Sequence, residues 1–434
     1  MNLHAWFECF AGCGVRYRLD QIVYRCEACG GLLEVRHDVD ALKQRSGSDW
    51  KQLFDSRLGR MSGVWSKKEL VLPELQDKSI VSLGEGNTPL IRSERFARHL
   101  GIDEIYIKQC GTSHTGSFKD LGMTVLVSMV NQIRSRIKAV ACASTGDTSA
   151  AVSAYCAAAG IPSIVFLPKD KVSIAQLIQP VANGAITLSI DTDFDGCMKI
   201  VQEITKDTSI YLANSMNSLR VEGQKTISFE IVQQLGWQVP DFVVVPGGNL
   251  GNVSAIGSGF LLMRDLGMID RLPRLVCAQT ERANPLYRAY REGFKNLESV
   301  TAGSTYATAI QIGNPVSFGK AVRALRATDG IVEQATEAEL VNASAEVDRF
   351  GFFNDPQTGV ALASTLKLVQ SRVVPASSRV VVISTAHGLK FAEFKTRFHS
   401  GELPEVNPSL RNLPINVPAD TAAVRAAIDG RITA

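Results

Sequence analysis

The sequence contains no apolar run of the roughly 18 residues that a membrane-spanning helix requires. Its first residues, 1–6, show neither a charged segment followed by an apolar one nor a pattern rich in arginine and serine, so no signal or transit peptide is predicted. The formal net charge is only +3, without a basic block, which gives no electrostatic support for nucleic-acid binding. These absences predict a soluble, cytoplasmic protein that binds neither membrane nor nucleic acid.

The sequence also lacks internal repeats and low-complexity segments. What it does have is 434 residues, a length that suggests two or three domains of ordinary size. It is 45% hydrophobic and 21% charged, which is typical of a globular protein with a sizeable core.

Nine cysteines divide into a scattered group and a clustered group. The scattered ones are predicted to be buried small hydrophobic residues: Cys110, Cys142, Cys156, Cys197 and Cys277. The clustered ones follow a Cys-x3-Cys, twelve-residue, Cys-x2-Cys spacing that resembles a zinc ribbon: Cys9, Cys13, Cys26 and Cys29. Because four thiolates leave no open position for a substrate, a metal here would be structural. The first pair is one residue longer than usual, so a ribbon that folds without metal remains the alternative.

The order of patterns along the chain predicts its organisation. Residues 1–40 form the zinc-ribbon-like segment, 41–80 an irregular arm with mixed charge, and 401–434 a tail that becomes helical from about Thr421. Residues 81–400 form an α/β body in which strands alternate with helices, which implies a parallel sheet covered by helices on both faces. Ligands of such sheets bind beyond the carboxyl ends of the strands. Strands are expected at 105–108, 139–143, 164–167, 242–245, 275–278 and 380–383.

Lys119 is the first candidate for chemistry. It follows a polar turn containing glycine, residues 113–118, and Leu121, Val125 and Met129 recur after it at helical spacing. The lysine therefore lies in the first turn of a helix, where the partial positive charge of the helix end disfavours a cation. An amine that is easily kept neutral suits Schiff-base chemistry. The alternative is an ordinary solvated surface lysine.

Residues 144–149 form a loop with four hydroxyls at the start of an alanine-rich helix that Gly160 ends. Such a loop suits an anion, either a phosphate or a carboxylate. Ordinary helix capping is the alternative, but it explains one hydroxyl and not four.

Residues 246–252, Pro-Gly-Gly-Asn-Leu-Gly-Asn, follow a predicted buried strand and precede a helix. The G-x-G-x-x-G dinucleotide fingerprint does not fit, because Asn249 holds the second glycine position and the next strand runs into Gln279 instead of an acid. No Walker pattern is present. Three glycines let backbone amides close around an anion, so a cup for a single phosphate is predicted.

Two further clusters lie near strand ends or helix starts. After the strand at 380–383, Thr385 could face a ring nitrogen, although spacing alone favours a capping Thr385 and a structural His387. Residues 214–225 offer amides, hydroxyls and Arg220, whose guanidinium suits bidentate binding of phosphate or carboxylate. The alternative for this cluster is a helix entry with a surface arginine.

A lysine, two anion loops and a ring-facing hydroxyl form a constellation suited to pyridoxal phosphate. In this combination and order the chain resembles the threonine synthases, pyridoxal-phosphate enzymes of the tryptophan-synthase-β-like fold, called fold type II. The resemblance rests on residues 117–120, 143–149, 214–226, 246–252 and 385–390. Two further stretches, 64–68 and 189–198, are most similar to the plant-type branch.

The resemblance implies a fold and a set of roles. The fold is α/β, with two interleaved domains across residues 81–400, the smaller covering approximately 125–230. Lys119 is the catalytic residue that holds the cofactor as an imine and then acts as acid and base on substrate carbons. Thr385 faces the pyridine nitrogen, which a hydroxyl leaves unprotonated, and Asp147 lies near the phenolic oxygen, where many members have asparagine.

The remaining implied roles concern anions. The cofactor phosphate is expected to be bound by Gly247, Gly248, Asn249, Leu250 and Gly251. The carboxylate and phosphate of the substrate are expected to be bound by Ser144, Thr145, Thr148, Asn214, Ser215 and Arg220.

The implied reaction converts O-phospho-L-homoserine and water to L-threonine and phosphate, and a homodimer is expected. The nearest alternative is a threonine or serine dehydratase of the same fold, which needs no second phosphate site. Outside catalysis, the ribbon could belong to a zinc-dependent interaction or nucleic-acid-binding protein, but the near-neutral charge opposes this.

Overall fold

A computed structural model describes the whole chain except residues 1, 145, 170–173, 409 and 433–434. Its centre is a six-stranded sheet in the order β12-β11-β10-β13-β5-β4, in which only the edge pair β4–β5 is antiparallel. The strands of this larger sheet are β4 (Leu90–Arg92), β5 (Glu104–Gln109), β10 (Phe242–Pro246), β11 (Arg274–Thr280), β12 (Ile331–Ala335) and β13 (Arg379–Ser384).

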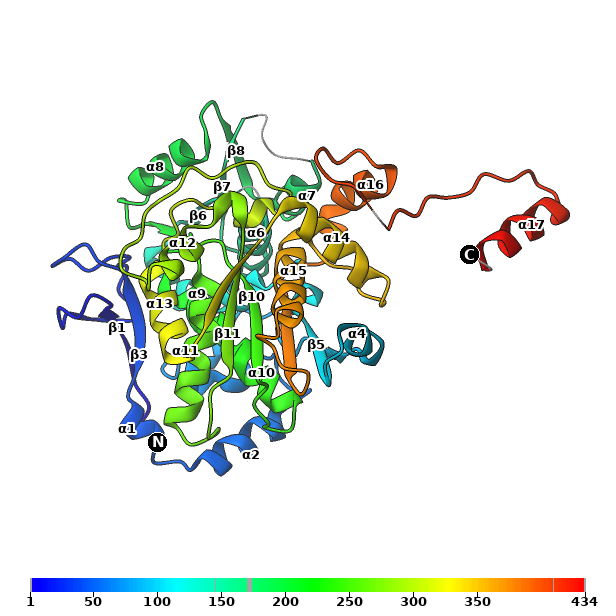
Figure 1. Ribbon diagram of the computed structural model, residues 1–434. Helices are drawn as coiled ribbons and strands as arrows, with labels where there is room; N and C mark the ends of the chain where they lie inside the picture. The colour runs from blue at the N-terminus through cyan, green and yellow to red at the C-terminus, as the bar shows by residue number, and fades with distance from the viewer. Residues whose placement is uncertain (1, 145, 170–173, 409, 433–434) are drawn as a thin grey trace.

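A second, fully parallel sheet lies beside the first at the top of Figure 1, in the order β8-β7-β6-β9. Its strands are β6 (Ala139–Ala143), β7 (Ser163–Pro168), β8 (Ile186–Ile190) and β9 (Ile210–Leu212). The predicted βα alternation and parallel pairing are therefore confirmed, and the fold type implied by the resemblance is present with two sheets.

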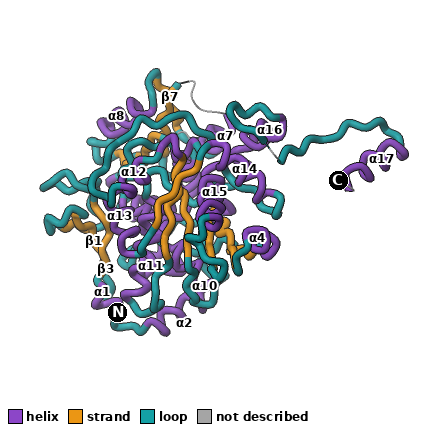
Figure 2. Tube along the Cα trace, in the orientation of Figure 1, coloured by secondary structure: helices purple, strands orange, loops and turns teal. Residues whose placement is uncertain are grey.

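Alternate residues of the larger sheet divide the core in two. Val243, Val245 and Val381 face one hydrophobic cluster, and Val244 and Val382 face the other, as the period of two along a strand requires. Helices cover both faces, as Figure 2 shows. The α-helices of the body are α4 (Glu94–Leu100), α5 (Lys119–Gln132), α6 (Asp147–Ala159), α7 (Ile174–Ala182), α8 (Phe194–Ile204), α9 (Ser218–Gln224), α10 (Thr226–Gln234), α11 (Gly251–Asp265), α12 (Pro285–Arg291), α13 (Phe318–Ala327), α14 (Glu337–Asp348), α15 (Pro356–Gln370) and α16 (Ala392–Ser400). Short 3-10 turns connect them at η3 (Cys110–Thr112), η4 (Arg134–Arg136), η5 (Glu281–Ala283), η6 (Thr308–Ile310) and η7 (Gly388–Phe391).

The N-terminal segment forms a small antiparallel sheet, β2-β1-β3, along one side of the body (Figure 1). Its strands are β1 (Ala5–Cys9), β2 (Arg16–Arg18) and β3 (Leu33–His37). The three-residue β2 lies between the two cysteine pairs.

The arm at residues 41–80 is not irregular as predicted. It begins just after the start of α1 (Val39–Leu42) and contains α2 (Gly47–Arg57), η1 (Trp65–Lys67), α3 (Lys68–Val71) and η2 (Asp77–Ser79). Ser46 caps α2 by accepting the Asp49 N–H, and the helix buries Trp50 and Phe54 completely. The mixed charge that suggested irregular structure lies on the outer face of this helix, while two large aromatic rings anchor its inner face.

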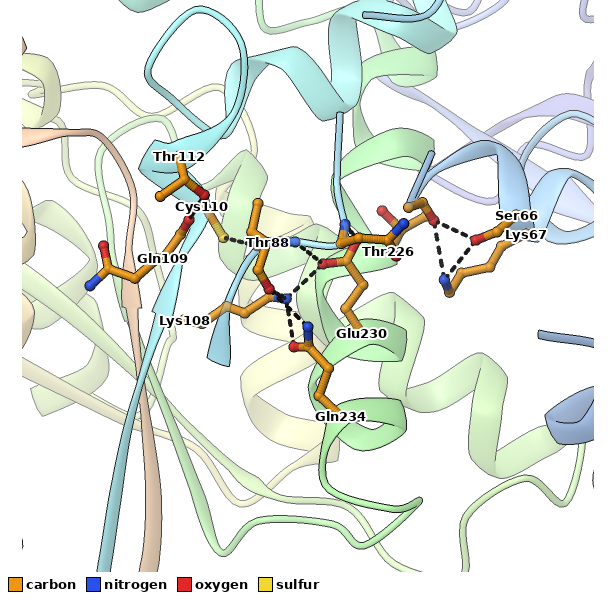
Figure 3. Close-up of polar contacts among 12 residues, drawn as sticks. Ser66, Lys67, Thr88, Lys108, Gln109, Cys110, Thr112, Thr226, Glu230 and Gln234 are labelled. Atoms are coloured by element: carbon orange, nitrogen blue, oxygen red, sulfur yellow. Dashed lines mark hydrogen bonds and ion pairs between the residues drawn. The ribbon is translucent and has the colours of Figure 1, made fainter. Parts of the chain in front are cut away.

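A buried polar cluster ties the larger sheet to α10 (Figure 3). Lys108, at the end of β5, donates to Glu230 on α10 at 2.6 Å, and both side chains are almost fully buried. Lys108 also donates to the Thr88 carbonyl at 2.7 Å and to Gln234 at 2.9 Å. Every donor of this ammonium therefore has a partner.

The tail is helical at α17 (Thr421–Ile432), as predicted, and this helix stands off the body at the end of an extended segment (Figure 1). Over the part of the chain that the structure describes, no helix has the length and apolar character needed to cross a bilayer.

Candidate active site

The backbone before Lys119 pairs with the segment after β13. The Phe118 N–H donates to the Thr385 carbonyl at 2.9 Å, and the His387 N–H donates to the Gly116 carbonyl at 2.9 Å. An isolated antiparallel bridge joins Ser117 to Ala386 between them. Two segments that are more than 250 positions apart in the printed numbering are therefore adjacent, and Lys119 begins α5 next to the carboxyl end of the larger sheet.

Lys119 is partly buried, and its surroundings favour the neutral amine. Burial, together with the neighbouring Arg220 and Lys390, lowers the pKa of Lys119 to about 7, although Asp147 and Asp355 act in the opposite direction. Its Nζ lies 3.7 Å from the centre of the Phe118 ring. The predicted first-turn position is confirmed, and the alternative of a solvated surface lysine is wrong.

Two glycines bring the helix that carries Arg220 against the helix that carries Lys119. A Cβ at Gly122 of α5 would lie 2.7 Å from the Arg220 carbonyl oxygen, and a Cβ at Gly223 of α9 would lie 1.7 Å from the Leu121 carbonyl oxygen. Only residues without a side chain permit this close approach of two backbones.

Arg220 itself is buried, with 4% of its surface exposed. Its Nη1 donates to the Ala213 carbonyl at 3.1 Å and its Nη2 to Thr148 Oγ1 at 3.3 Å, whereas the buried Nε has no partner among the described residues. Burial lowers the pKa of Arg220 to about 10, so it stays charged at neutral pH. A buried charge without a carboxylate partner is costly, and an anionic ligand would relieve that cost. The alternative of a surface arginine is wrong.

Ser144 and residues 146–149 lie at the N-terminus of α6, next to this arginine. Ser144 Oγ accepts the N–H groups of Gly146 and Ser149, each at 3.3 Å, so Ser144 also acts as a helix cap. Asp147 Oδ1 forms an ion pair with Lys390 at 2.8 Å. Thr145 lies outside the described residues.

Asn214 has a use that the prediction did not include. Its Oδ1 accepts the Ala143 N–H at 3.1 Å and its Nδ2 donates to the Ala143 carbonyl at 2.9 Å. The amide therefore ties the segment after β9 to the end of β6, and the contact of Asn214 with substrate stays a prediction. Ser215, next to it, is partly exposed.

The glycine turn follows β10 and leads into α11. A Cβ at Gly248 would lie 2.9 Å from the Ile310 backbone, so the turn needs glycine there. Leu250 has φ +63° as the N-cap of α11, whose first residue is Gly251. The opening N–H groups of a helix have no partner within it. Asn252 is 7% exposed, and neither polar atom of its amide has a partner among the described residues. N–H groups without hydrogen-bond partners around a glycine turn suit the binding of a phosphate.

Thr385 follows directly after β13. Its side chain is 6% exposed, and its Oγ1 donates to Asp355 Oδ1 at 3.5 Å. The Ala386 N–H donates to the other oxygen of Asp355 at 2.9 Å. Burial raises the pKa of Asp355. His387 accepts the Leu389 N–H at 3.2 Å, so the interpretation of His387 as a structural residue is confirmed.

Two residues of this site were missed from sequence. Asp355 caps α15 by accepting the Thr358 N–H, and an aspartate directly before a proline is a recognisable start of a helix, but nothing in that pattern indicates Thr385 as its second partner. Lys390 belongs to residues 385–390, one of the stretches that carry the family resemblance, but its ion pair with Asp147 depends on tertiary structure.

The arrangement links an easily neutralised amine to two candidate anion-binding sets: the segment before Lys119 pairs with the end of β13, next to β10 and its glycine turn, and the helix of Lys119 crosses the helix of Arg220. One set is the glycine turn of the larger sheet, and the other is Arg220 with the N-terminus of α6 on the smaller sheet. Thr385 offers a buried hydroxyl beside them. These residues fit pyridoxal phosphate together with a second anionic molecule.

Comparison with known proteins agrees with this geometry. Residues 81–386 match the family described as pyridoxal-phosphate dependent enzyme. The chain is 57% identical over 418 residues to threonine synthase 2, chloroplastic, of Arabidopsis thaliana, covering 94% of this chain and 81% of that relative. It is 42% identical over 379 residues to the threonine synthase of Methanocaldococcus jannaschii, covering 87% and 91%.

Solved structures extend the likeness of fold. The threonine synthase of Escherichia coli superposes with a TM-score of 0.68 at 20% identity, covering 98% of this chain and all of that one. Threonine deaminase isoform 2 of Solanum lycopersicum gives 0.62 at 18% identity, covering 71% and 81%. At such identities the structures establish the fold, while the sequence relatives carry the narrower likeness.

Proposed function

This chain belongs to the pyridoxal-phosphate-dependent enzymes and, among them, to the threonine synthases, and from that premise we propose that its substrate is O-phospho-L-homoserine, converted with water to L-threonine and phosphate. The observation that carries the proposal is that Lys119 lies near two candidate anion-binding sets: buried Arg220, whose Nε has no partner among the described residues, and the glycine turn at the same sheet edge. A phosphorylated substrate on a phosphorylated cofactor requires two such sets.

When bound, pyridoxal phosphate supplies an electron sink that stabilises negative charge at the carbons of the substrate. Gly248, Asn249, Leu250 and Gly251 would hold its phosphate through backbone N–H groups, while Gly247, whose own N–H donates to the Ala278 carbonyl at 2.7 Å, would begin the turn. Thr385 would face its ring nitrogen. Asp355 Oδ1 lies 3.5 Å from Thr385 Oγ1 and holds this side chain in place; with the cofactor bound, the single hydroxyl proton would turn from Asp355 to the ring nitrogen.

Lys119 moves the protons in this proposal. An amine with a pKa near 7 can accept and return a proton at neutral pH with little cost in either direction. It takes the protons from Cα and then Cβ, and the bond from Cγ to the phosphate oxygen breaks, so that phosphate leaves. A proton is returned to Cγ, the hydroxyl of a water molecule adds at Cβ, and a second proton is returned to Cα; the remaining proton of the water leaves with the phosphate. Asp147, held by Lys390, sits at the start of α6 beside the amine.

Arg220 binds the leaving phosphate in this proposal. Its unspent Nε and the N-terminus of α6 together offer charge and N–H donors to a dianion. Ser144, Thr145, Thr148, Asn214 and Ser215 complete the substrate site, and Asn214 also pairs with Ala143.

The experiment is an absorption spectrum followed by the Lys119→Ala variant. The wild-type protein is expected to show a visible band from the bound cofactor and to release phosphate from O-phospho-L-homoserine. The variant is expected to lose both, because no other amine replaces Lys119. Turnover retained in Lys119→Ala would refute its role.

A threonine or serine dehydratase of the same fold is the alternative. It would release ammonia from threonine or serine and would leave Arg220 without a phosphate to bind. Parallel assays of phosphate and ammonia release distinguish the two activities.

We also propose a homodimer and a cytoplasmic location. The family resemblance supports the first, and light scattering should give twice the 47.0 kDa of one chain. The free state of all nine cysteines supports a reducing compartment. Cell fractionation tests the location against the chloroplast named for the Arabidopsis relative.

A further inference from the structure

The four clustered cysteines converge on one point. Their Sγ atoms all lie within 4.8 Å of one another. Cys9 and Cys29 are 3.4 Å apart, Cys13 and Cys26 are 3.3 Å apart, and Cys13 and Cys29 are 3.8 Å apart. Tetrahedral zinc with bonds of about 2.3 Å requires sulfur atoms about 3.8 Å apart. All four thiols are free of disulfides.

We propose that these four thiolates bind one structural Zn²⁺, and that this ion holds in place the helix that presents Arg220. No residue of the catalytic site takes part in the metal site, so the ion acts through the packing of the ribbon on the body.

The turns around the cysteines suit a metal knuckle. In the second pair, the Gly30 N–H donates to the Cys26 carbonyl at 2.8 Å and the Gly31 N–H to Cys29 Sγ at 3.4 Å. In the first pair, Gly12 takes φ +83° and its N–H donates to the Cys9 carbonyl at 3.1 Å. The extra residue of Cys-x3-Cys is therefore accommodated by a left-handed turn that glycine allows.

The ribbon has little else to hold its outer end together. Its strands are five, three and five residues long, and Cys13 and Cys29 are exposed. A motif of this size cannot bury enough apolar surface to fix its own geometry, and a structural metal commonly supplies the missing stability.

Polar contacts join the inner end of the ribbon to two helices of the body. The Leu33 carbonyl, at the start of β3, accepts from Lys320 Nζ on α13 at 2.6 Å and from the Ser218 hydroxyl at the start of α9. Glu34 accepts from both terminal nitrogens of Arg323, also on α13.

The last residue of β3 reaches further along α9. His37 Nε2 lies 2.8 Å from Glu222, with both side chains about 5% exposed, and Glu222 pairs with Lys225. Arg220 lies on α9 between Ser218 and Glu222. The strand that begins four residues after Cys29 therefore contacts α9 on both sides of the predicted phosphate-binding arginine.

Metal content is the first test. Protein purified without a metal-affinity tag is expected to contain about one zinc per chain by elemental analysis. Protein expressed in medium with cobalt in place of zinc should show the visible absorption bands of tetrahedral thiolate coordination. The double variant Cys13→Ser, Cys29→Ser should lose the metal, while the matched control Cys156→Ser, a buried cysteine in α6, should keep it. Wild-type protein without zinc, or with iron in its place, overturns the metal site even if the double variant fails to fold.

The coupling to α9 is the second test, and it rests on the proposed role of Arg220. The double variant should keep the cofactor band, while its KM for O-phospho-L-homoserine and the inhibition constant of inorganic phosphate both rise about tenfold. Unchanged constants in a zinc-free variant overturn the coupling and leave the metal site standing. Failure of the proposed function itself would show as no turnover in zinc-containing wild-type protein.

Discussion

The surroundings of Lys119 favour the neutral form of its amine. A free lysine has a pKa of about 10.4, whereas burial, with Arg220 and Lys390 adding to it, brings the pKa of Lys119 to about 7. The cations that lower this pKa come from α9 and from the segment after β13, so the amine is prepared by elements distant in sequence. The depressed pKa gives Schiff-base chemistry the neutral amine it needs near neutral pH.

Capture of pyridoxal phosphate by the cofactor-free protein should therefore titrate with Lys119. Its rate is expected to rise as the pH increases through about 7 and to level off above that value, because the neutral form then dominates. Lys390→Met should shift the midpoint to higher pH, since it removes a cation and leaves Asp147 unpaired. Stopped-flow absorbance at a series of pH values measures both; a rise that continues toward pH 10 would show an ordinary lysine.

The role of a residue could be predicted where the neighbouring residues in the sequence form a recognisable pattern. Lys119 and the glycine turn could be predicted from local patterns, because the start of a helix and a glycine turn both depend on residues that are adjacent in the sequence. The pairings of Asp355 with Thr385, of Lys390 with Asp147 and of Asn214 with Ala143 could not be predicted, since the partners lie 30, 243 and 71 positions apart in the chain.

At the scale of elements, the crossing of α5 and α9 fixes the distance between the amine and the arginine. Gly223→Ala is expected to force the helices apart, since its Cβ would lie 1.7 Å from a carbonyl oxygen. Overpacking of this kind costs about 1–3 kcal/mol of the free energy of unfolding, and the displaced Arg220 should raise KM. Denaturant unfolding and steady-state kinetics measure the two effects.

Gly430→Ala in α17 is the matched control, because nothing lies within 4 Å of its added Cβ. It should leave KM unchanged and be neutral or slightly stabilising, as alanine is the better helix former. Equal behaviour of the two variants would contradict the role assigned to the crossing.

The ion pair between β5 and α10 is the second prediction at this scale (Figure 3). Burial alone would raise the pKa of Glu230, but Lys108 and Lys67 hold it below its ordinary value. Glu230→Gln leaves Lys108 buried without an anion and should cost about 3–5 kcal/mol. Glu203→Gln breaks an ion pair that is 71% exposed on both sides and should cost about 1 kcal/mol or less.

The same pair predicts a response to acid. A carboxylate with a depressed pKa stabilises the fold above its unfolded pKa, and this contribution is lost as the pH falls through the folded value. Wild-type stability should therefore decline in acid more steeply than that of Glu230→Gln. Denaturant midpoints measured from pH 7 downward test this; parallel curves would show that Glu230 does not titrate with folding.

Strands were the elements best predicted from sequence. The strand at 139–143 was predicted with its observed bounds, and those at 242–245 and 380–383 lie within one residue of them, because continuous apolar runs between turn residues leave little choice. The arm at 41–80 was misread because charged residues outnumber the few rings that anchor it, and burial of Trp50 is a tertiary property.

At the scale of the whole molecule, the alternation of strands and helices in the sequence indicates parallel pairing but does not indicate the number of sheets. The division into two sheets depends on which strands pair, and β6 pairs with β9 instead of joining β5, its predecessor in the chain. Packing across the molecule determines which strands pair. The division into two units was therefore predicted only from the family resemblance. The domain bounds given for the smaller unit, approximately 125–230, remain a prediction.

Because the predicted cofactor site takes residues from both sheets, cofactor binding should stabilise the whole chain. At a concentration about a hundredfold above the dissociation constant, a ligand adds about 2.7 kcal/mol to the free energy of unfolding. With about 2 cal/mol/K of unfolding entropy per residue, this raises the thermal midpoint of a chain of this length by about 3 °C. Calorimetry of cofactor-free protein with increasing pyridoxal phosphate measures the rise. Lys119→Ala should retain a smaller rise, since the glycine turn still offers its N–H groups to the phosphate. A midpoint independent of cofactor concentration in the wild-type protein would show that the two sheets do not share the site.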